Sequence, residues 1–174
     1  MILQKDFYNR DTTAVAKELL GKYLVRKIGN RILAYSIIET EAYVGPNDKA
    51  CHASRGFTKR TAVMFGPPGI AYIYLIYGMY YCLNIVTRES GYPAAVLIRA
   101  LDHPEMTGPG RLTKFLNITG SHNGADMTKR YTLWIENRGV IVKKNAITAT
   151  PRIGVGYAGE WSKKPFRYII KNSD

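Results

Sequence analysis

The chain has 174 residues, of which 46% are hydrophobic, so it is long enough to form one domain with an ordinary buried core. It carries 25 Lys and Arg against 13 Asp and Glu, and the formal charge of +12 attracts polyanions such as nucleic acid. On charge alone, a basic protein without a nucleic-acid partner is the alternative. Two cysteines exclude a disulfide framework, and three scattered histidines give little support for a metal site. We therefore expect a single domain over residues 1–174, with no metal and no cofactor.

The first eleven residues are polar and include acids, which is typical of neither a signal peptide nor a transit peptide. Residues 61–87 carry no charge, and about 20 apolar residues are enough to cross a bilayer. However, this stretch contains paired prolines, five tyrosines and an asparagine, which argue against a membrane span. We expect a protein that is cytoplasmic, or nuclear if its source is eukaryotic, and neither secreted nor embedded in a membrane.

The N-terminal part of the chain predicts a helix followed by a β-hairpin. Capping residues at 11–13 precede an apolar pattern at helical spacing over residues 14–20, and Gly21 suits a left-handed C-terminal cap. Residues 23–28 and 31–44 then predict two strands joined by a Gly-Asn turn. Residues 45–69 are rich in Gly and Pro and predict a long loop, a feature that commonly carries function.

Five tyrosines lie in the uncharged run over residues 72–84. About 15 residues are too many for a typical strand, and Gly78 falls in the middle, so the run predicts two strands that turn at residues 77–79. Aromatic side chains in a basic protein are well suited to stacking on bases.

The second half of the chain predicts four strands and one helix. The strands are expected at 93–100, 131–136, 140–144 and 165–170, with the middle two forming a hairpin, and the helix at 111–118. The glycine-rich residues 153–159 lack the Lys and Ser or Thr of a phosphate-binding loop and predict a tight loop. Two short helices among many strands indicate an α+β fold. We expect a mostly antiparallel, curved sheet with a protruding hairpin.

Glu39, Glu41 and Tyr43 alternate along a predicted strand and therefore share one face. Paired carboxylates at a strand end suit general acid–base chemistry, but a solvated polar face fits the same spacing equally well. Arg99 is the one charge in an apolar strand, so we expect a carboxylate partner such as Glu41, either for structure or to orient a water. His52 lies in the long loop, where it can stack on a planar base, although a lone histidine is more often structural.

Five sequence blocks follow one another through nearly the whole chain. They are Glu39-Thr-Glu-Ala-Tyr-Val-Gly-Pro46, His52-Ala53-Ser54, Tyr74-Leu-Ile-Tyr-Gly-Met-Tyr80 with Asn84, Leu97-Ile-Arg99-Ala-Leu101, and Arg152-Ile-Gly-Val-Gly-Tyr-Ala-Gly-Glu-Trp161. In this order and spacing they resemble the alkyladenine family of 3-methyladenine DNA glycosylases. Five blocks in sequence are far more specific than any one of them.

The resemblance implies a monofunctional DNA glycosylase of base excision repair that acts as a monomer on double-stranded DNA containing damaged purines. Its substrates would be alkylated or deaminated purines such as 3-methyladenine, 7-methylguanine, hypoxanthine and ethenoadenine. By the same resemblance, Glu41 is the general base that activates a water, and Arg99 and the backbone around Val155 hold that water. A non-catalytic nucleic-acid-binding module is the alternative, in which Glu39 and Glu41 are only structural.

The resemblance also assigns the residues that would hold the damaged base. Tyr43, His52 and Tyr74 would form the walls of the pocket around a flipped purine. Asn84 would crowd the position of the exocyclic amine of guanine. Tyr77, at the tip of the predicted hairpin, would enter the minor groove and fill the gap left by the extruded base.

Overall fold

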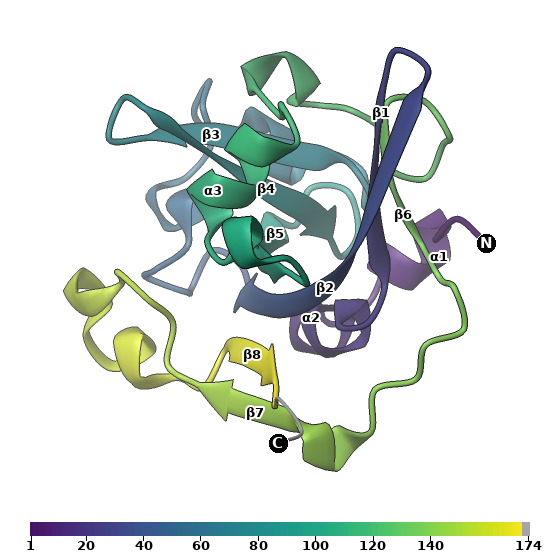
Figure 1. The fold of residues 1–174 in the computed structure, drawn as a ribbon. Helices are drawn as coiled ribbons and strands as arrows, with labels where there is room; N and C mark the ends of the chain where they lie inside the picture. Colours follow the sequence, from purple (N-terminus) through teal and green to yellow (C-terminus); the bar gives the residue numbers. More distant parts are fainter. Residues whose placement is uncertain (172–174) are drawn as a thin grey trace.

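An antiparallel sheet of eight strands organises the fold (Figure 1). The computed structural model describes residues 1–171, in which the strand order is β3-β4-β5-β2-β1-β6, and β8 pairs with both β2 and β7. The strands are β1 (Tyr23–Ile28), β2 (Arg31–Tyr43), β3 (Ala71–Ile76), β4 (Tyr80–Thr87), β5 (Ala94–Leu101), β6 (Leu133–Glu136), β7 (Ile147–Thr150) and β8 (Arg167–Ile170).

Short helices make up the rest of the regular structure. The α-helices are α1 (Lys5–Tyr8), α2 (Thr12–Leu19) and α3 (Pro109–Phe115). The 3-10 helices are η1 (His52–Arg55), η2 (Ala62–Phe65), η3 (Pro104–Met106), η4 (Gly120–His122), η5 (Lys144–Ala146) and η6 (Gly156–Lys163). Many antiparallel strands with a few short helices confirm the predicted α+β class. Within residues 1–171, no helix has the length and apolar character needed to cross a membrane.

The predicted N-terminal helix is confirmed as α2, which begins two residues earlier than expected. The Asp11 side chain caps it by accepting hydrogen bonds from the backbone N–H groups of Thr13 and Ala14, both at 3.0 Å. Gly21 follows with a φ of +80°, and a Cβ there would lie 2.7 Å from Val142, so both conformation and space require glycine. The hairpin of β1 and β2 also forms as predicted.

Strand β2 is long and pairs with two sets of neighbouring strands along its length. Residues 31–36 pair with β1, and residues 37–43 pair with β5 and β8. The register with β5 shifts on both sides of Glu39, an irregularity that bends the strand at this point. The end of β2 therefore lies between two neighbours, β5 and β8, which bring side chains from distant parts of the sequence to it.

The tyrosine-rich run folds into the predicted hairpin of β3 and β4. Its turn has positive φ angles at Tyr77 (52°) and Gly78 (66°), and the Met79 N–H donates to the Ile76 carbonyl at 3.2 Å. Two consecutive left-handed residues match the twist of a tight hairpin. This hairpin extends away from the rest of the sheet (Figure 1).

The predicted hairpin of residues 131–136 and 140–144 is wrong. β6 forms and pairs with β1, but its other edge is filled by the N-terminus: Ile2 bridges to Glu136, and the Leu3 N–H donates to the Ile135 carbonyl at 2.9 Å. With that edge occupied, residues 140–143 have no strand partner within the described chain, and valines of this segment pack against Gly21 instead.

The remaining C-terminal predictions differ mainly in their bounds. The predicted helix at 111–118 forms as α3, which ends earlier because Asn117 adopts a positive φ of 49°. The closing strand forms as β8, and β7, which no pattern predicted, pairs with it. The predicted tight loop at 153–159 runs into η6.

The two faces of β2 have different surroundings, and this difference places the site. On one face, the buried Thr40 hydroxyl donates to the Ala16 carbonyl of α2 at 2.9 Å, so α2 covers this side. Glu39, Glu41 and Tyr43 alternate with Thr40 and therefore point to the opposite face. That face is lined by the segment after β2 and by residues from β3, β4 and β5.

Candidate active site

Glu41 is a fully buried carboxylate, 0% exposed, that three groups contact. The Tyr43 hydroxyl donates to Oε2 at 2.9 Å, and the Ile153 backbone N–H donates to Oε1 at 2.8 Å. Arg99 Nη1 lies 3.5 Å from the same Oε1. Because a buried charge is costly unless it is paired, these contacts explain how an acid is accommodated at the end of β2.

Arg99 contacts Glu39 as well as Glu41. Its Nε donates to Glu39 Oε1 at 3.0 Å, a shorter contact than the one to Glu41. Arg167 of β8 donates to the same Glu39 oxygen at 2.6 Å. The predicted pairing of Arg99 with a carboxylate therefore involves both glutamates. With Arg167, the cluster has two carboxylates and two guanidinium groups, so its formal charges balance.

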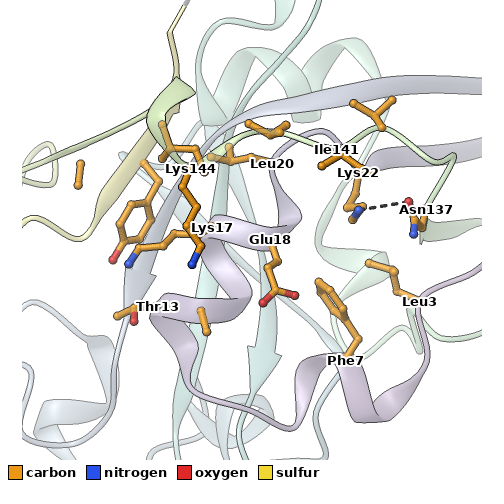
Figure 2. Close-up of a pocket in the computed structure, with 16 residues that line it drawn as sticks. Leu3, Phe7, Thr13, Lys17, Glu18, Leu20, Lys22, Asn137, Ile141 and Lys144 are labelled. Atoms are coloured by element: carbon orange, nitrogen blue, oxygen red, sulfur yellow. Dashed lines mark hydrogen bonds between the residues drawn. The ribbon is translucent and has the colours of Figure 1, made fainter.

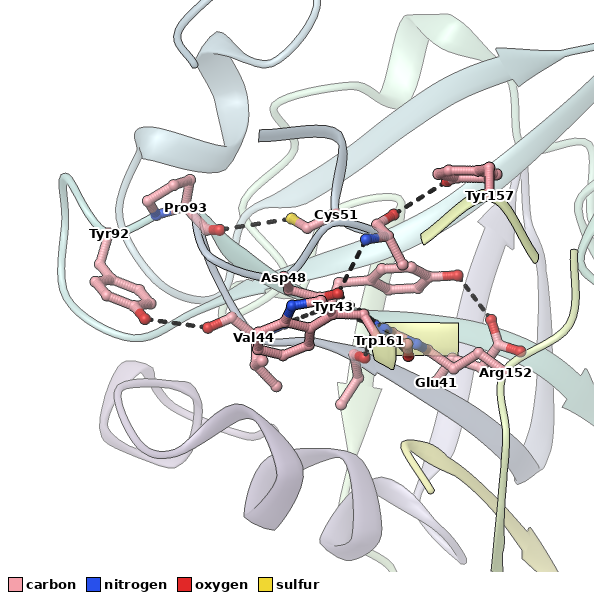
Figure 3. A network of polar contacts seen from close by, with 12 residues as sticks. Glu41, Tyr43, Val44, Asp48, Cys51, Tyr92, Pro93, Arg152, Tyr157 and Trp161 are labelled. Carbon is pink, nitrogen blue, oxygen red and sulfur yellow. Dashed lines mark hydrogen bonds and ion pairs between the residues drawn. The ribbon is translucent and has the colours of Figure 1, made fainter. Parts of the chain in front are cut away.

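A second ion pair also contacts the end of β2. Asp48, in the loop after β2, and Arg152, after β7, are both buried and pair through two N–H···O contacts (Figure 3). The guanidinium also lies 4.7 Å from the centre of the Tyr43 ring. Neither Asp48 nor Arg152 was predicted as a site residue.

Aromatic side chains form a small pocket beside Glu41. Its walls are Tyr43, Cys51, His52, Met64, Tyr72, Tyr74, Asn84 and Ala95. The four residues that the sequence predicts as pocket walls are all among them. The free volume is about 10 Å³, which is room for about one water molecule.

The pocket is narrow because its rings contact one another. The ring centres of His52 and Tyr74 are 4.4 Å apart at an interplanar angle of 67°, and His52 Nδ1 lies 3.1 Å from the Tyr72 hydroxyl. A planar base stacked between two rings requires a separation of about 7 Å, twice the usual contact distance. A base can therefore enter only if the walls separate.

Burial moves the pKa values of the pocket side chains further from neutral pH, so these side chains are uncharged there. It raises the pKa of Tyr43 well above its ordinary value, with Glu41 as a further cause, and it raises the pKa of Tyr72 to about 12. Burial also lowers the pKa of His52 to about 4, and the nearby Arg60 adds to the effect. The phenols are therefore hydrogen-bond donors, and the imidazole is neutral.

Asn84 has a fixed position in the pocket wall. It is buried, and its Nδ2 donates to the backbone carbonyls of Tyr72 at 3.2 Å and Cys82 at 3.4 Å. With both amide protons used by the backbone of β3 and β4, the side chain cannot rotate freely. Its bulk is a fixed boundary of the pocket.

Tyr77 lies outside the pocket, at the tip of the hairpin of β3 and β4, and is 85% exposed. Met79 and Tyr80 are also exposed next to it. An exposed cluster of large apolar side chains on a projecting turn is typical of a surface that contacts a partner.

Val155 is buried against Ala50 and Ala158, and its carbonyl accepts a hydrogen bond from the Ala158 N–H at 2.9 Å. The backbone group that contacts Glu41 is the N–H of Ile153, two residues earlier in the chain. The glycine-rich segment therefore does approach Glu41, the predicted general base. The role of Val155 in holding a water stays a prediction.

A larger groove lies elsewhere, between α2 and residues 137–149 (Figure 2), with a volume of about 880 Å³. Apolar side chains such as Leu20 and Ile141 and the lysines Lys17, Lys22 and Lys144 line it. None of the predicted site residues borders this groove, and the acids and aromatic rings gather in the smaller pocket, which is therefore the candidate active site. Among residues 1–171, no group of three or more His, Cys, Asp or Glu is placed to hold a metal ion.

Several contacts of the site were missed from the sequence alone. Arg167 had a detectable signal, since it is a charge within a predicted apolar strand, just as Arg99 is. Asp48 and Arg152 are separated by about a hundred residues and gave no local pattern that would have joined them. The register of β2 with β8 brings Arg167 opposite Glu41.

Comparison with known proteins places this geometry in a family. The model of the methylpurine-DNA glycosylase family matches residues 6–107 and 102–174. Three relatives are provisionally named 3-methyladenine DNA glycosylases. The one from Methanocella arvoryzae is 51% identical (99% of this chain, 94% of the relative), the one from Legionella pneumophila strain Corby 48% (98% and 95%), and the one from Myxococcus xanthus 46% (98% and 91%).

The family is one of enzymes, which favours the predicted DNA glycosylase over the non-catalytic binding module. The matched residues include both glutamates of β2, the aromatic pocket and the hairpin. By the family match and by its similarity to these relatives along nearly its whole length, the chain belongs to the methylpurine-DNA glycosylase family.

Proposed function

We propose that this enzyme is a monofunctional DNA glycosylase that releases alkylated or deaminated purines from double-stranded DNA by water attack on the N-glycosidic bond. It acts as a monomer, with residues 1–174 as one glycosylase domain. The substrates are 3-methyladenine, 7-methylguanine, hypoxanthine and ethenoadenine. The observation that carries the proposal is the buried carboxylate of Glu41 beside an aromatic pocket.

Glu41 supplies the general base. A carboxylate has about four acceptor positions, and contacts from Tyr43, Ile153 and Arg99 account for three of them. The fourth, on Oε2, can accept from a water once the pocket walls separate, and Glu41 takes a proton from that water as its oxygen attacks C1′ of the damaged nucleotide. Arg99 and the backbone near Val155 help to hold that water.

The damaged purine lies in the aromatic pocket after it has been flipped from the duplex. Unstacking a base costs a few kcal/mol, and less for a damaged or mispaired base, so part of the selectivity arises before the pocket is reached. Tyr43, His52 and Tyr74 then stack on the purine. Methylated purines carry a positive charge, which the faces of the tyrosine rings attract.

Two features of the pocket add selectivity. The fixed amide of Asn84 crowds the position of the exocyclic amine of guanine and thereby disfavours undamaged guanine. The neutral imidazole of His52 can lie on a cationic base without repulsion, because burial lowers its pKa to about 4. Admission of a base requires the His52 and Tyr74 rings to separate from their 4.4 Å contact.

Tyr77 replaces the flipped base within the duplex. Its position at the tip of a projecting turn, with 85% of the side chain exposed, suits insertion from the minor groove. Basic residues on the exposed loop beside the pocket, Arg55, Lys59 and Arg60, are suited to the neighbouring phosphates. Contacts of this kind make binding dependent on salt.

The test is base release from a panel of duplexes, each with one 3-methyladenine, 7-methylguanine, hypoxanthine or ethenoadenine. We expect the free base in solution and an intact abasic strand. An otherwise identical undamaged duplex is the control. Binding to these duplexes without release of any base would contradict the proposal.

A further inference from the structure

The geometry points to a role for the buried ion pair of Asp48 and Arg152 in positioning Glu41 for catalysis. This inference rests on the proposed function of Glu41 as the general base. The pair acts through Tyr43 and Ile153, which donate two of the three contacts to the Glu41 carboxylate. Asp48 and Arg152 are therefore positioning residues.

Asp48 fixes the loop that follows β2. Its carboxylate is 0% exposed and accepts hydrogen bonds from the backbone N–H groups of Val44 and Ala50, both at 3.1 Å. It also receives both terminal nitrogens of Arg152 (Figure 3). Four donors satisfy this acid, so it has a defined position relative to the end of β2.

Arg152 connects the end of β2 to the glycine-rich segment. Its Nη1 donates to the Ala42 carbonyl at 2.8 Å, and its Nη2 donates to the Trp161 carbonyl at 3.2 Å. The centre of its guanidinium lies 4.7 Å from the centre of the Tyr43 ring and 5.3 Å from that of Phe166. The planar fork is needed for this set of contacts, because a lysine ammonium is a single point charge.

Both links to Glu41 follow from these contacts. Ile153 is the next residue after Arg152, so fixing Arg152 also fixes the direction of the Ile153 N–H toward Glu41. The guanidinium packs on the face of Tyr43 and thereby holds its hydroxyl at Glu41 Oε2. The third contact, from Arg99, comes from β5 and does not involve the pair.

A purely structural role is the competing explanation, because breaking a buried ion pair strongly destabilises a protein. Arg26 offers a matched control. It is a buried arginine, 6% exposed, that donates to the carbonyls of Leu116, Lys27, Thr132 and Asn117. It pairs in register with Leu33, near the opposite end of β2 from Glu41.

The experiment compares Arg152→Lys, the double variant Asp48→Asn with Arg152→Met, and Arg26→Met. Each is measured for its thermal midpoint, for affinity to a duplex with a tetrahydrofuran abasic analogue, and for single-turnover release of ethenoadenine well below its midpoint. A misplacement of the catalytic group by about 1 Å can slow a reaction by about 100-fold. We therefore expect both Arg152 variants to release base about 10- to 100-fold more slowly than wild type, with unchanged affinity for the duplex. Arg26→Met lowers the midpoint but not the rate.

The pH dependence of single-turnover release separates positioning from stability. The charged and titratable groups around Glu41 are Glu39, Tyr43, Tyr74, Cys82, Arg99, Arg152 and Arg167. The double variant changes the N–H and O–H donors around the catalytic carboxylate, so its pH–rate profile should differ from that of wild type. It should stay unchanged in Arg26→Met.

The outcomes distinguish the two proposals. Wild-type rates and an unchanged pH profile in the Arg152 variants would overturn the positioning role while leaving the proposed function intact. A wild-type enzyme that releases no base would contradict the proposed function itself. If the double variant does not fold, Arg152→Lys decides the question, because it keeps the charge beside Asp48 and loses the fork.

Discussion

Replacement of Tyr77 by Asn tests whether the hairpin tip is a wedge. Asn is chosen because it tolerates the left-handed backbone at this position, where φ is 52°. The side chain is 85% exposed, so its removal should leave the thermal midpoint unchanged. On DNA, the ring would replace the stacking of one base, worth about 1–3 kcal/mol. The dissociation constant should therefore rise about 5- to 150-fold.

Fluorescence anisotropy measures this effect on a duplex whose single ethenoadenine nucleotide carries a 2′-fluorine, which resists cleavage of the N-glycosidic bond. The same oligonucleotide as a single strand is the comparison, since it has no partner strand to separate. Tyr131→Asn is the matched control, because Tyr131 is also exposed, at 65%, and lies outside the hairpin. An equal loss of affinity for duplex and single strand, or no loss on the duplex, would refute the wedge.

Three further predictions concern the chemistry and electrostatics of the site. In the folded protein His52 should stay neutral down to about pH 4, whereas in the unfolded chain it takes up a proton near pH 6.5. The contribution of this residue to the free energy of unfolding is therefore lost as the pH falls from 6.5 to about 4. Urea unfolding at pH 7 and pH 5 should show a smaller loss in His52→Gln than in wild type, and an equal loss would disprove the shifted pKa. Borohydride should trap no covalent complex with DNA, because water is the nucleophile, and a trapped adduct would show an amine nucleophile. Affinity for duplex DNA should fall steeply with salt, and a flat dependence would argue against contacts from Arg55, Lys59 and Arg60 to phosphates.

Local sequence patterns predicted the parts of the fold that depend on neighbours in the chain. The Asp11 cap, Gly21 and the turn at Tyr77 and Gly78 each have a conformational requirement that the sequence displays directly. The failed hairpin at residues 140–144 shows the limit of such patterns. The segment has strand-forming residues, but the N-terminal residues already occupy the edge of β6 that it would need.

The residues of the candidate site also fall into two groups, those that a local pattern predicts and those that only the packing of the strands brings together. Alternation along one strand predicted that Glu39, Glu41 and Tyr43 share a face, and the structure brings them together around Arg99. The contacts that hold Glu41 from the C-terminal part of the chain depend on how β7 and β8 pack beside β2. No local pattern encodes that packing: the resemblance assigned the backbone around Val155 to the site, but the contacts of Arg152 and Ile153 emerged only from the structure.

The central claim is that Glu41 activates the attacking water, and the most direct measurement is single-turnover release of ethenoadenine and hypoxanthine by Glu41→Gln. Glutamine is nearly isosteric and retains an acceptor oxygen for its neighbours, but it cannot take a proton from water. We predict that base release is abolished while affinity for the lesion duplex is largely retained. Undiminished release in this variant would contradict the assignment of Glu41 as the general base.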